Sequence, residues 1–200
     1  MLWYIKNNIF NLQSTLVVRY DLSQLPTERF SYPVLINGLK LYAKRLFELS
    51  PEYQLKIEEA FSQMDHPPLF DIKEAMDRLK NGFFFVILEN ESGILGWSWA
   101  AINKVYFNDF NCFLKINDKA AFSFNTYVKR QFRGRRLNRV IVNEKLFHLK
   151  QAGYNYIWGL IHQWNHPSIK SFTSMNWEII GKYYFMKFFF MNFRLPPKGI

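Results

Sequence analysis

The hydrophobic positions in the first part of the chain predict one extended segment followed by a helix. β-Favouring residues predict a strand over Ser14–Tyr20, inside an irregular or extended arm that spans residues 1–30. From Pro33 onward, apolar residues recur at positions i, i+4, i+7 and i+11, which places them on one face of a helix. They are Leu35, Leu39, Tyr42 and Leu46.

Two further helices carry start and stop signals. Ser50 followed by Pro51 marks a helix start, and the apolar stripe that follows runs to Met64 before two prolines. A shorter stripe over residues 72–79 is followed by Gly82, which suits the left-handed closing position of a helix. The predicted order therefore puts helices ahead of strands.

The apolar period then changes to that of strands. Phe83–Glu89 and Ile94–Asn103 are rich in β-forming residues and are separated by NESG, which predicts a hairpin. Val105–Lys115 and Ala121–Lys129 form a second pair of extended segments around a turn-like Asn-Asp. Together the four segments predict an antiparallel meander.

A strand, basic turn, helix and strand follow one another in the last part of the chain. The turn RQFRGRRLN leads into a helix that ends at Gln151 and is apolar on two sides, so both of its flanks should be covered. Tyr154–His162 is a strand by composition, and Asn165 is placed to cap a short helix. Trp177–Phe193 predicts one or two closing strands. This order of elements predicts one α+β domain over residues 31–200.

Composition favours a folded protein with one main core. The chain has 200 residues, of which 49% are apolar and 21% charged, so it is too apolar for disorder. Its apolar runs fall short of the ~20 residues that a membrane-spanning helix needs, so we expect no membrane span. The single cysteine, Cys112, allows no internal disulfide and no cysteine-based zinc site. We therefore expect a cytoplasmic location and no metal.

Positive charge is concentrated toward the end of the sequence. Residues 1–120 carry 13 Lys and Arg against 14 Asp and Glu, whereas residues 121–200 carry 13 against two. A basic half predicts an anionic partner, and phosphate groups, acidic lipid headgroups and nucleic acid all meet that requirement. Charge alone does not distinguish among them.

The basic turn is the strongest candidate for a binding site. A helix start presents unpaired N–H groups and the positive end of the helix dipole. Guanidinium groups beside such a start favour phosphate binding over a role as a solvated basic face. Five arginines lie here within ten residues: Arg130, Arg133, Arg135, Arg136 and Arg139.

The basic turn resembles the phosphate-binding motif of the GNAT acyltransferase superfamily, Gln/Arg-x-x-Gly-x-Gly/Ala after a strand. Arg133 takes the first motif position, and Gly134 and Leu137 match common family choices. The resemblance spans roughly residues 70–190 and includes the order of elements. It implies that this turn holds the diphosphate of coenzyme A.

The chain departs from that motif at two positions. Arg136 stands where the family has its first motif glycine, and Asn138 stands where it has glycine or alanine. Small residues there let the backbone approach the diphosphate closely. A second register, with Gln131 first and Gly134 as the first glycine, still ends on Arg136.

A second segment, NHPSIKSFTSMNW, resembles the family sequence that runs from the fifth strand into the last helix. Asn165 and Ser168 match it, and Trp177 takes the place of its terminal aromatic residue. In the family this asparagine contacts the pantetheine arm, so the resemblance assigns Asn165 to the cofactor. Phe172 stands where many members have a tyrosine that protonates the departing thiolate, and a phenyl ring has no proton to donate.

The resemblance implies a mixed, mostly antiparallel sheet flanked by helices, with a splayed gap between the fourth and fifth strands for acetyl-CoA. Backbone amides at the end of the fourth strand would polarise the thioester carbonyl, and the acetyl group would pass directly to a primary amine of a small molecule in a ternary complex. His162 and, through water, Glu89 are the candidate bases. The implied cofactor-binding residues are Tyr127, Val128, Arg133, Gly134, Arg135, Arg136, Leu137, Asn138, Asn165, Ser168 and Phe172.

Two other functions stay open at this point. The departures at Arg136, Asn138 and Phe172 favour a GNAT-like CoA-binding module that has lost efficient turnover. The basic charge of residues 121–200, with its interleaved aromatic side chains, is typical of nucleic-acid binding, which we rank last. The aromatic closing segment Tyr183–Phe193 is a candidate for pairing across a homodimer.

Overall fold

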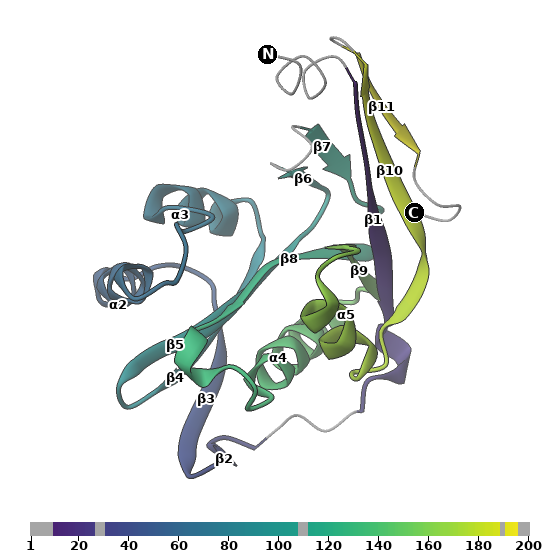
Figure 1. The fold of residues 1–200 in the computed structure, drawn as a ribbon. Coiled ribbons are helices and arrows are strands. Elements are labelled where there is room, and N and C mark those ends of the chain that lie inside the picture. The colour runs from purple at the N-terminus through teal and green to yellow at the C-terminus, as the bar shows by residue number, and fades with distance from the viewer. Residues whose placement is uncertain (1–9, 27–30, 108–111, 189–190, 196–200) are drawn as a thin grey trace.

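The computed structural model describes residues 10–26, 31–107, 112–188 and 191–195. Nine strands in these ranges form one sheet, and helices pack against both of its faces (Figure 1). The strands are β1 (Phe10–Asp21), β2 (Val34–Ile36), β3 (Leu39–Leu46), β4 (Phe84–Asn90), β5 (Gly93–Ala101), β6 (Lys104–Phe107), β7 (Cys112–Lys115), β8 (Ala120–Val128), β9 (Tyr156–His162), β10 (Glu178–Phe188) and β11 (Met191–Leu195). The helices are α2 (Pro51–Ser62), α3 (Ile72–Lys80), α4 (Leu137–Gln151) and α5 (His166–Thr173), with short 3-10 turns η1 (Leu22–Gln24) and η3 (Arg130–Phe132).

The sheet is mixed but mostly antiparallel. Its order is β11-β10-β1-β9-β8-β5-β4-β3-β2, and among the described strands only β8 and β9 pair in parallel. β6 and β7 pair with each other in a separate two-stranded sheet. The predicted fold class, a mixed sheet flanked by helices, is confirmed.

The sheet splits between β8 and β9, because these strands pair over only part of their length. Ala120–Ser123 pair with Tyr156–Gly159, and beyond them β8 stays with β5 while β9 stays with β1. A bulge that includes Asn125, where φ is +46°, bends β8 just past the last β9 contact. Figure 1 shows the two halves of the sheet diverging from this point. This is the splayed gap that the resemblance implied.

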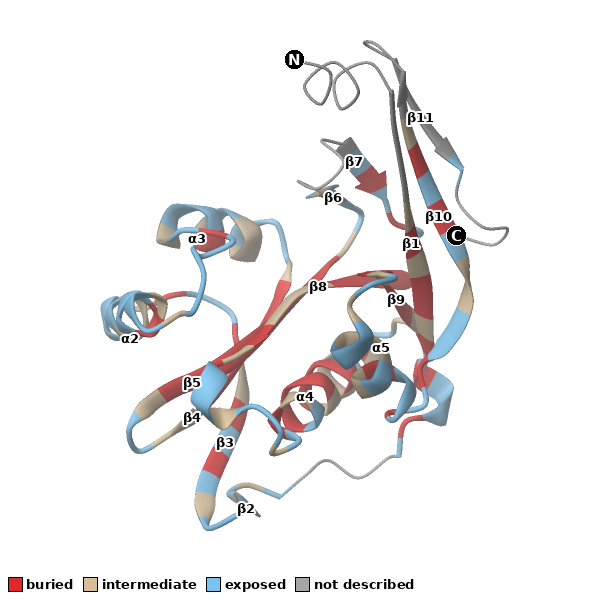
Figure 2. Cartoon of the chain, viewed as in Figure 1, coloured by how far each residue is buried: buried red, intermediate tan, exposed pale blue. Residues whose placement is uncertain are grey.

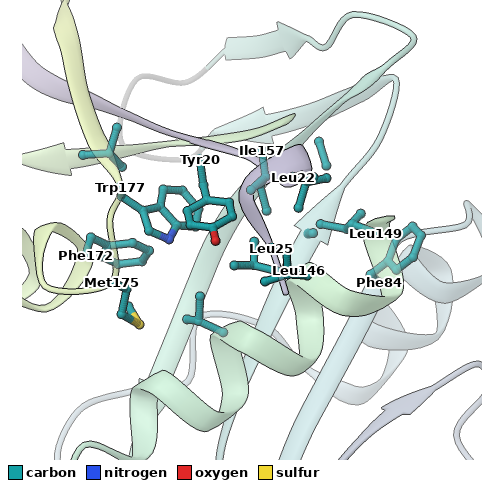
Figure 3. Packing of buried hydrophobic residues seen from close by; sticks show 14 of the residues in the cluster. Tyr20, Leu22, Leu25, Phe84, Leu146, Leu149, Ile157, Phe172, Met175 and Trp177 are labelled. Atoms are coloured by element: carbon teal, nitrogen blue, oxygen red, sulfur yellow. The ribbon is translucent and has the colours of Figure 1, made fainter. Parts of the chain in front are cut away.

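Alternate side chains of the strands pack into two layers. Phe85 and Ile87 of β4 pack with α2 and α3, whereas Val86 and Leu88 pack with α4 on the opposite face. α4 is buried along most of its length, as its two apolar flanks predicted (Figure 2). A further cluster joins α4, α5, β1 and β9 (Figure 3); its labelled members include Tyr20, Leu146, Leu149, Ile157, Phe172, Met175 and Trp177.

The helix predicted from Pro33 is wrong, because this segment forms the β2–β3 hairpin. The strands are joined by Asn37 and Gly38, which both have positive φ (50° and 77°). Asn-Gly is favoured in tight hairpin turns because both turn positions need left-handed backbone. Burial in β3 alternates as in a strand, with Leu41 buried and the adjacent Tyr42 exposed. The local turn chemistry outweighs an apolar spacing that also fitted a helix.

Most other elements lie where the sequence predicted them: α2, α3, the β4–β5 hairpin, α4, β9, α5 and the closing strands. Val105–Lys115, predicted as one extended segment, instead contains β6 and β7, which pair with each other and not with β8. The predicted strand Ser14–Tyr20 lies within β1, an internal strand between β9 and β10, and residues 1–9 lie outside the described part. No helix in the described ranges is long and apolar enough to cross a membrane.

Candidate functional site

The basic turn leads from the end of β8 into α4. After η3, Gly134 and Arg136 adopt positive φ angles of 78° and 59°. Glycine adopts such an angle without a penalty, whereas for a residue with a side chain the left-handed backbone costs about 1–2 kcal/mol of conformational free energy. Among the described side chains none caps the start of α4, so the N–H groups of Leu137 and Asn138 are left for water or a ligand, while that of Arg139 donates to the carbonyl of Arg136 at 3.0 Å. Arg136 therefore combines a glycine-like backbone position with a guanidinium group at an open helix start.

A cavity of about 730 Å³, here called the basic cavity, opens between this turn and α5. The described residues that line it include four cationic side chains and no carboxylate: Arg133, Arg136, Arg139 and Lys170. The other lining residues are Val128, Phe132, Gly134, Leu137, Asn138, Pro167, Ser171, Ser174 and Met175. The cavity thus joins the basic turn to the helix that follows Asn165, and its lining suits an anion.

Arg133 does not face the cavity as a free cation. Its guanidinium donates to both carboxylate oxygens of Asp65, at 2.8 and 2.9 Å, and to the carbonyl of Val128 at 2.9 Å. Hydrogen bonding from Arg133 holds the pKa of Asp65 below its usual value. Lys129 likewise donates to Gln63 at 2.8 Å. These two pairs, here called the β8 clamp, fasten the connection between α2 and α3 to the end of β8.

Arg136 and Arg139 have no carboxylate partner among the described residues. Of the turn arginines that line the basic cavity, they are therefore the two that are available to bind an anion, while Arg130 does not line it. Arg135, in contrast, lies over the ring of Phe132, 5.8 Å from its centroid, and does not line the basic cavity.

Asn138 bridges the two helices that border the basic cavity. Its side-chain amide donates to Ser171 Oγ at 2.9 Å, which links the first turn of α4 to α5. Its Oδ1 is buried and has no hydrogen-bond partner among the described residues. A buried carbonyl oxygen with unused capacity is unfavourable unless something donates to it. The departure from a small residue at this position therefore adds a polar group beside the cavity.

A second cavity, of about 230 Å³, lies in the splayed gap and is here called the gap cavity. β8 contributes Phe122–Thr126 and β9 contributes Gly159–His162. Leu69 approaches from the α2–α3 connection, and Phe172 approaches from α5. Because its walls come from both layers, the gap cavity runs through the sheet.

Asn165 and Phe172 both line the gap cavity, where they have different roles. The Asn165 side chain caps α5 by accepting from the N–H of Ser168 at 3.2 Å. Phe172 is buried with its ring edge-on to Trp177, the centroids being 4.7 Å apart (Figure 3). It presents an apolar wall to the gap and has no proton to donate.

The two candidate bases lie in different surroundings. His162 lines the gap cavity, and its ring stacks on that of the exposed Trp164 with centroids 5.3 Å apart. Glu89 lies at the outer end of β4, where it pairs with Lys44 at 2.5 Å and accepts from Tyr53 at 3.2 Å. Glu89 lines neither the basic cavity nor the gap cavity. The fold therefore brings His162, and not Glu89, to the splayed gap.

The end of β8 lies unusually close to β5. A Cβ atom at Gly96 would stand only 2.4 Å from the carbonyl oxygen of Tyr127. The Tyr127 ring packs on Trp97 with centroids 4.7 Å apart and lines neither cavity. On its other edge β8 has no strand partner past Ser123 within the described ranges. Part of the backbone hydrogen-bonding capacity of β8 past Ser123 is thus left for a ligand.

Lys145 carries polar chemistry that was not predicted from the sequence. It lies in the middle of α4, fully buried, and its Nζ donates to Ser98 Oγ and Ser123 Oγ at 2.6 Å each. Burial lowers its pKa to about 7. The available signal was the apolar pattern on both flanks of α4, since it leaves little exposed surface for a lysine between them. Beside it, the buried Glu144 hydrogen-bonds to His148 at 3.0 Å.

Comparison with known proteins identifies the fold. No protein-family model matches the sequence, and no curated protein is similar to it in sequence. Among solved structures, a putative GNAT-family acetyltransferase from Novosphingobium aromaticivorans aligns with a TM-score of 0.58 and 10% identity over 87% of this chain and 63% of that chain. A GCN5-related N-acetyltransferase from Sphaerobacter thermophilus aligns with a TM-score of 0.56 and 15% identity over 93% of this chain and 55% of that chain.

A third similar structure is a GCN5-related N-acetyltransferase from Kribbella flavida, with a TM-score of 0.55 and 8% identity over 93% of this chain and 62% of that chain. The chain thus spans 55–63% of the length of these three structures. Together they show that it has the GNAT acetyltransferase fold, as the sequence resemblance predicted.

Proposed function

We propose that this chain, which has the GNAT fold, transfers an acetyl group from acetyl-CoA to a primary amine of a small molecule in a ternary complex. One observation carries the proposal: α5 borders both a cation-lined cavity at an open helix start and the gap cavity in the splayed sheet. These two cavities suit an elongated ligand that is anionic at one end and carries a thioester at the other. Cations gathered in a cavity favour such a ligand over nucleic acid.

The residues of the basic cavity are compatible with a diphosphate. Arg136, Arg139 and Lys170 supply positive charge, and the start of α4 supplies N–H donors. Asn165 and the free edge of β8 would hold the pantetheine amides in the gap. When bound there, acetyl-CoA would supply the acyl group as an activated thioester.

His162 is the base that we assign to the acceptor amine, since it lines the gap cavity. A neutral amine is required for attack on the thioester, and a base at this position would take up the proton that the nitrogen loses. Glu89 is engaged by Lys44 and Tyr53 away from both cavities, so we do not assign it that role. A reducing, cytoplasmic compartment remains our expectation, on the basis of the single cysteine.

A CoA-binding module with weak turnover is the second candidate. It is favoured by Phe172, which offers no proton to the thiolate, and by the bulky Arg136 and Asn138 in the phosphate-binding turn. Release of free thiol at many turnovers with any amine of a broad panel would exclude it.

A homodimer through the closing strands stays a prediction. β10 is already paired on both edges, with β1 and β11. β11 is the last strand of the sheet, and its outer edge has no partner within the described part of the chain. Pairing across a dimer would therefore use β11.

Calorimetric titration with acetyl-CoA and with CoA tests the proposal. We expect the double variant Arg136→Gln/Arg139→Gln to bind at least about 100-fold more weakly, because each charged hydrogen bond contributes about 1.5–3 kcal/mol. Lys73→Gln, which removes an exposed charge from α3, is the matched control and should bind like the wild type. The proposal fails if the folded wild type binds neither compound at millimolar concentration.

A further inference from the structure

A buried amine in α4 is connected to the gap cavity by hydroxyl groups. Lys145 Nζ donates to Ser98 Oγ and Ser123 Oγ, both at 2.6 Å, and approaches the carbonyl of Trp99 at 3.5 Å. Ser98 Oγ in turn lies 2.6 Å from Thr126 Oγ1. Ser123 and Thr126 both line the gap cavity. Two hydrogen-bonded branches therefore lead from one amine to the same cavity.

The bulge in β8 is what brings both branches to one side. In a regular strand, residues 123 and 126 would point to opposite faces, because their separation is odd. Trp99 pairs with Phe124 but Trp97 pairs with Tyr127, so β8 holds one residue more than β5 at this point. The extra residue re-aims the chain, and Asn125 adopts a left-handed backbone there. The feature that opens the gap thus also turns Thr126 toward Ser98.

Stability does not account for an amine at this position. Lys145 is 0% exposed, and no carboxylate among the described residues pairs with it. Desolvation opposes its charged form, which is why its pKa falls to about 7. An apolar side chain of similar length would fill the same space without that penalty. The amine is therefore better explained by a use for its exchangeable proton.

We propose that Lys145, acting through Ser123, delivers the proton that the departing thiolate needs and that Phe172 cannot supply. This inference rests on the proposed acetyl transfer. Lys145 does not touch the substrate and is a positioning residue, whereas Ser123 lines the gap where the thioester would lie. Ser98 and Thr126 form the return path.

The proton transfers balance without a further reactant. The amine nitrogen forms a bond to the carbonyl carbon, the carbon–sulfur bond breaks, and His162 takes the proton that the nitrogen loses. The sulfur takes a proton from the Ser123 hydroxyl, which is replenished by the Lys145 ammonium group. Lys145 then regains a proton from His162, carried across the gap cavity by water to Thr126 and from there through Ser98. The products are the amide and the thiol, and both residues return to their starting states.

The other titratable groups on the elements packed against Lys145 contact other residues, are exposed, or line one of the two cavities. β5 carries none, and the single one on β8, Tyr127, lies in the α2–α3 core. On α4, Glu144 and His148 bond to each other, and on β3 and β4, Lys44 and Glu89 do the same. Also on α4, Arg139 lines the basic cavity and Lys150 donates to the carbonyl of Leu25, and on β3 the side chains of Lys40 and Tyr42 are exposed. The remaining groups are Arg45, which lies over the Phe84 ring, and His162 in the gap cavity.

Steady-state kinetics of thiol release, with calorimetry of acetyl-CoA binding, tests the relay. For Lys145→Met and Ser123→Ala we expect kcat to fall about 100-fold, while KM and acetyl-CoA affinity stay within about 3-fold of wild type. The wild-type kcat should decrease as the pH rises past about 7, where Lys145 loses its proton, and this limb should disappear in Lys145→Met. Thr126→Val should lower kcat less, because water in the gap can replace the return path.

Lys150→Met is the matched control, since it removes an amine from the same helix outside both cavities. It should leave kcat and the pH profile unchanged. If circular dichroism shows that Lys145→Met is unfolded, Ser123→Ala and Thr126→Val decide the question. An unchanged kcat in the folded variants, or a loss of kcat with matching loss of affinity and an unchanged pH profile, overturns the relay alone. A wild type that binds no acetyl-CoA or acetylates no amine overturns the proposed function, and the relay with it.

Discussion

Replacing Gly96 with alanine would measure how closely β5 and β8 must approach beside the gap. The new Cβ would stand 2.4 Å from the Tyr127 carbonyl oxygen, 3.0 Å from Ile141 Cδ1 and 3.2 Å from Val128 Cα. Ordinary contacts begin at 3.4 Å, so the carbonyl oxygen would be about 1 Å too close. Because two of the three contacts are to backbone atoms, no side-chain rotation can relieve them, and the strands themselves must separate.

Overpacking of this kind lowers the free energy of unfolding by about 1–3 kcal/mol, and by more when backbone must move. For Gly96→Ala we expect a loss of about 2–4 kcal/mol, equivalent to a fall in Tm of roughly 4–16 °C for a chain of this size. Urea unfolding followed by circular dichroism measures it directly. Calorimetry of the folded variant should also show weaker acetyl-CoA binding, because the end of β8 borders both cavities.

Gly159→Ala on β9 is the control for the loss of a glycine from the same sheet. Its nearest contact would be 3.2 Å, to the Ser123 carbonyl oxygen, so a shift of a few tenths of an ångström accommodates it. We expect Gly159→Ala to lower the free energy of unfolding by less than half as much as Gly96→Ala does. A Gly96→Ala variant within about 0.5 kcal/mol of wild type would show that the strands can separate freely and would refute this reasoning.

Three further predictions concern the clamp, the cap and the missing acid. Because Arg133 lowers the pKa of Asp65, their pair stabilises the fold above the ordinary carboxyl pKa, and this contribution is lost as the pH falls through the lowered value. Asp65→Asn should therefore be less stable at neutral pH and lose less stability on acidification, as measured by urea unfolding across the acid range. Asn165→Ala should lose about 1 kcal/mol of stability with its cap, whereas Asn165→Asp keeps the cap; weaker acetyl-CoA binding by both variants would mark a direct contact. Phe172→Tyr should restore kcat at least about 10-fold in the Lys145→Met background, and no gain would count against the relay.

The parts of the fold that could be predicted from sequence are those with local signals. Ser50 accepts from the N–H of Tyr53 at the start of α2, and Asn165 caps α5, as the residue types predicted. The β4–β5 hairpin followed from two β-forming runs around a short turn. The error at Pro33 was also local, since the turn pair Asn37-Gly38 outweighs a helical spacing that four apolar residues met by coincidence.

What could not be predicted depends on contacts between distant parts of the chain. The ion pair of Arg133 with Asp65 joins residues 68 positions apart, and nothing near either residue indicates it. Lys145 meets Ser98 and Ser123 only because α4 lies across β5 and β8. The basic turn was visible as a run of arginines, but which of them are available to an anion follows from tertiary pairing. Sequence therefore indicates where the site is, and folding selects which side chains act in it.

The position of β1 between β9 and β10 has a consequence for biosynthesis. β1 leaves the ribosome before β9, and its register with β9 matches Thr15 to His162, about 150 residues later. At translation rates of roughly 5–20 residues per second, β1 waits about 7–30 s for its partners. The wall of the gap that contains His162 is therefore completed after β5 and β8 have had time to pair. A nascent chain stalled before residue 156 would hold the basic turn but only one side of the gap.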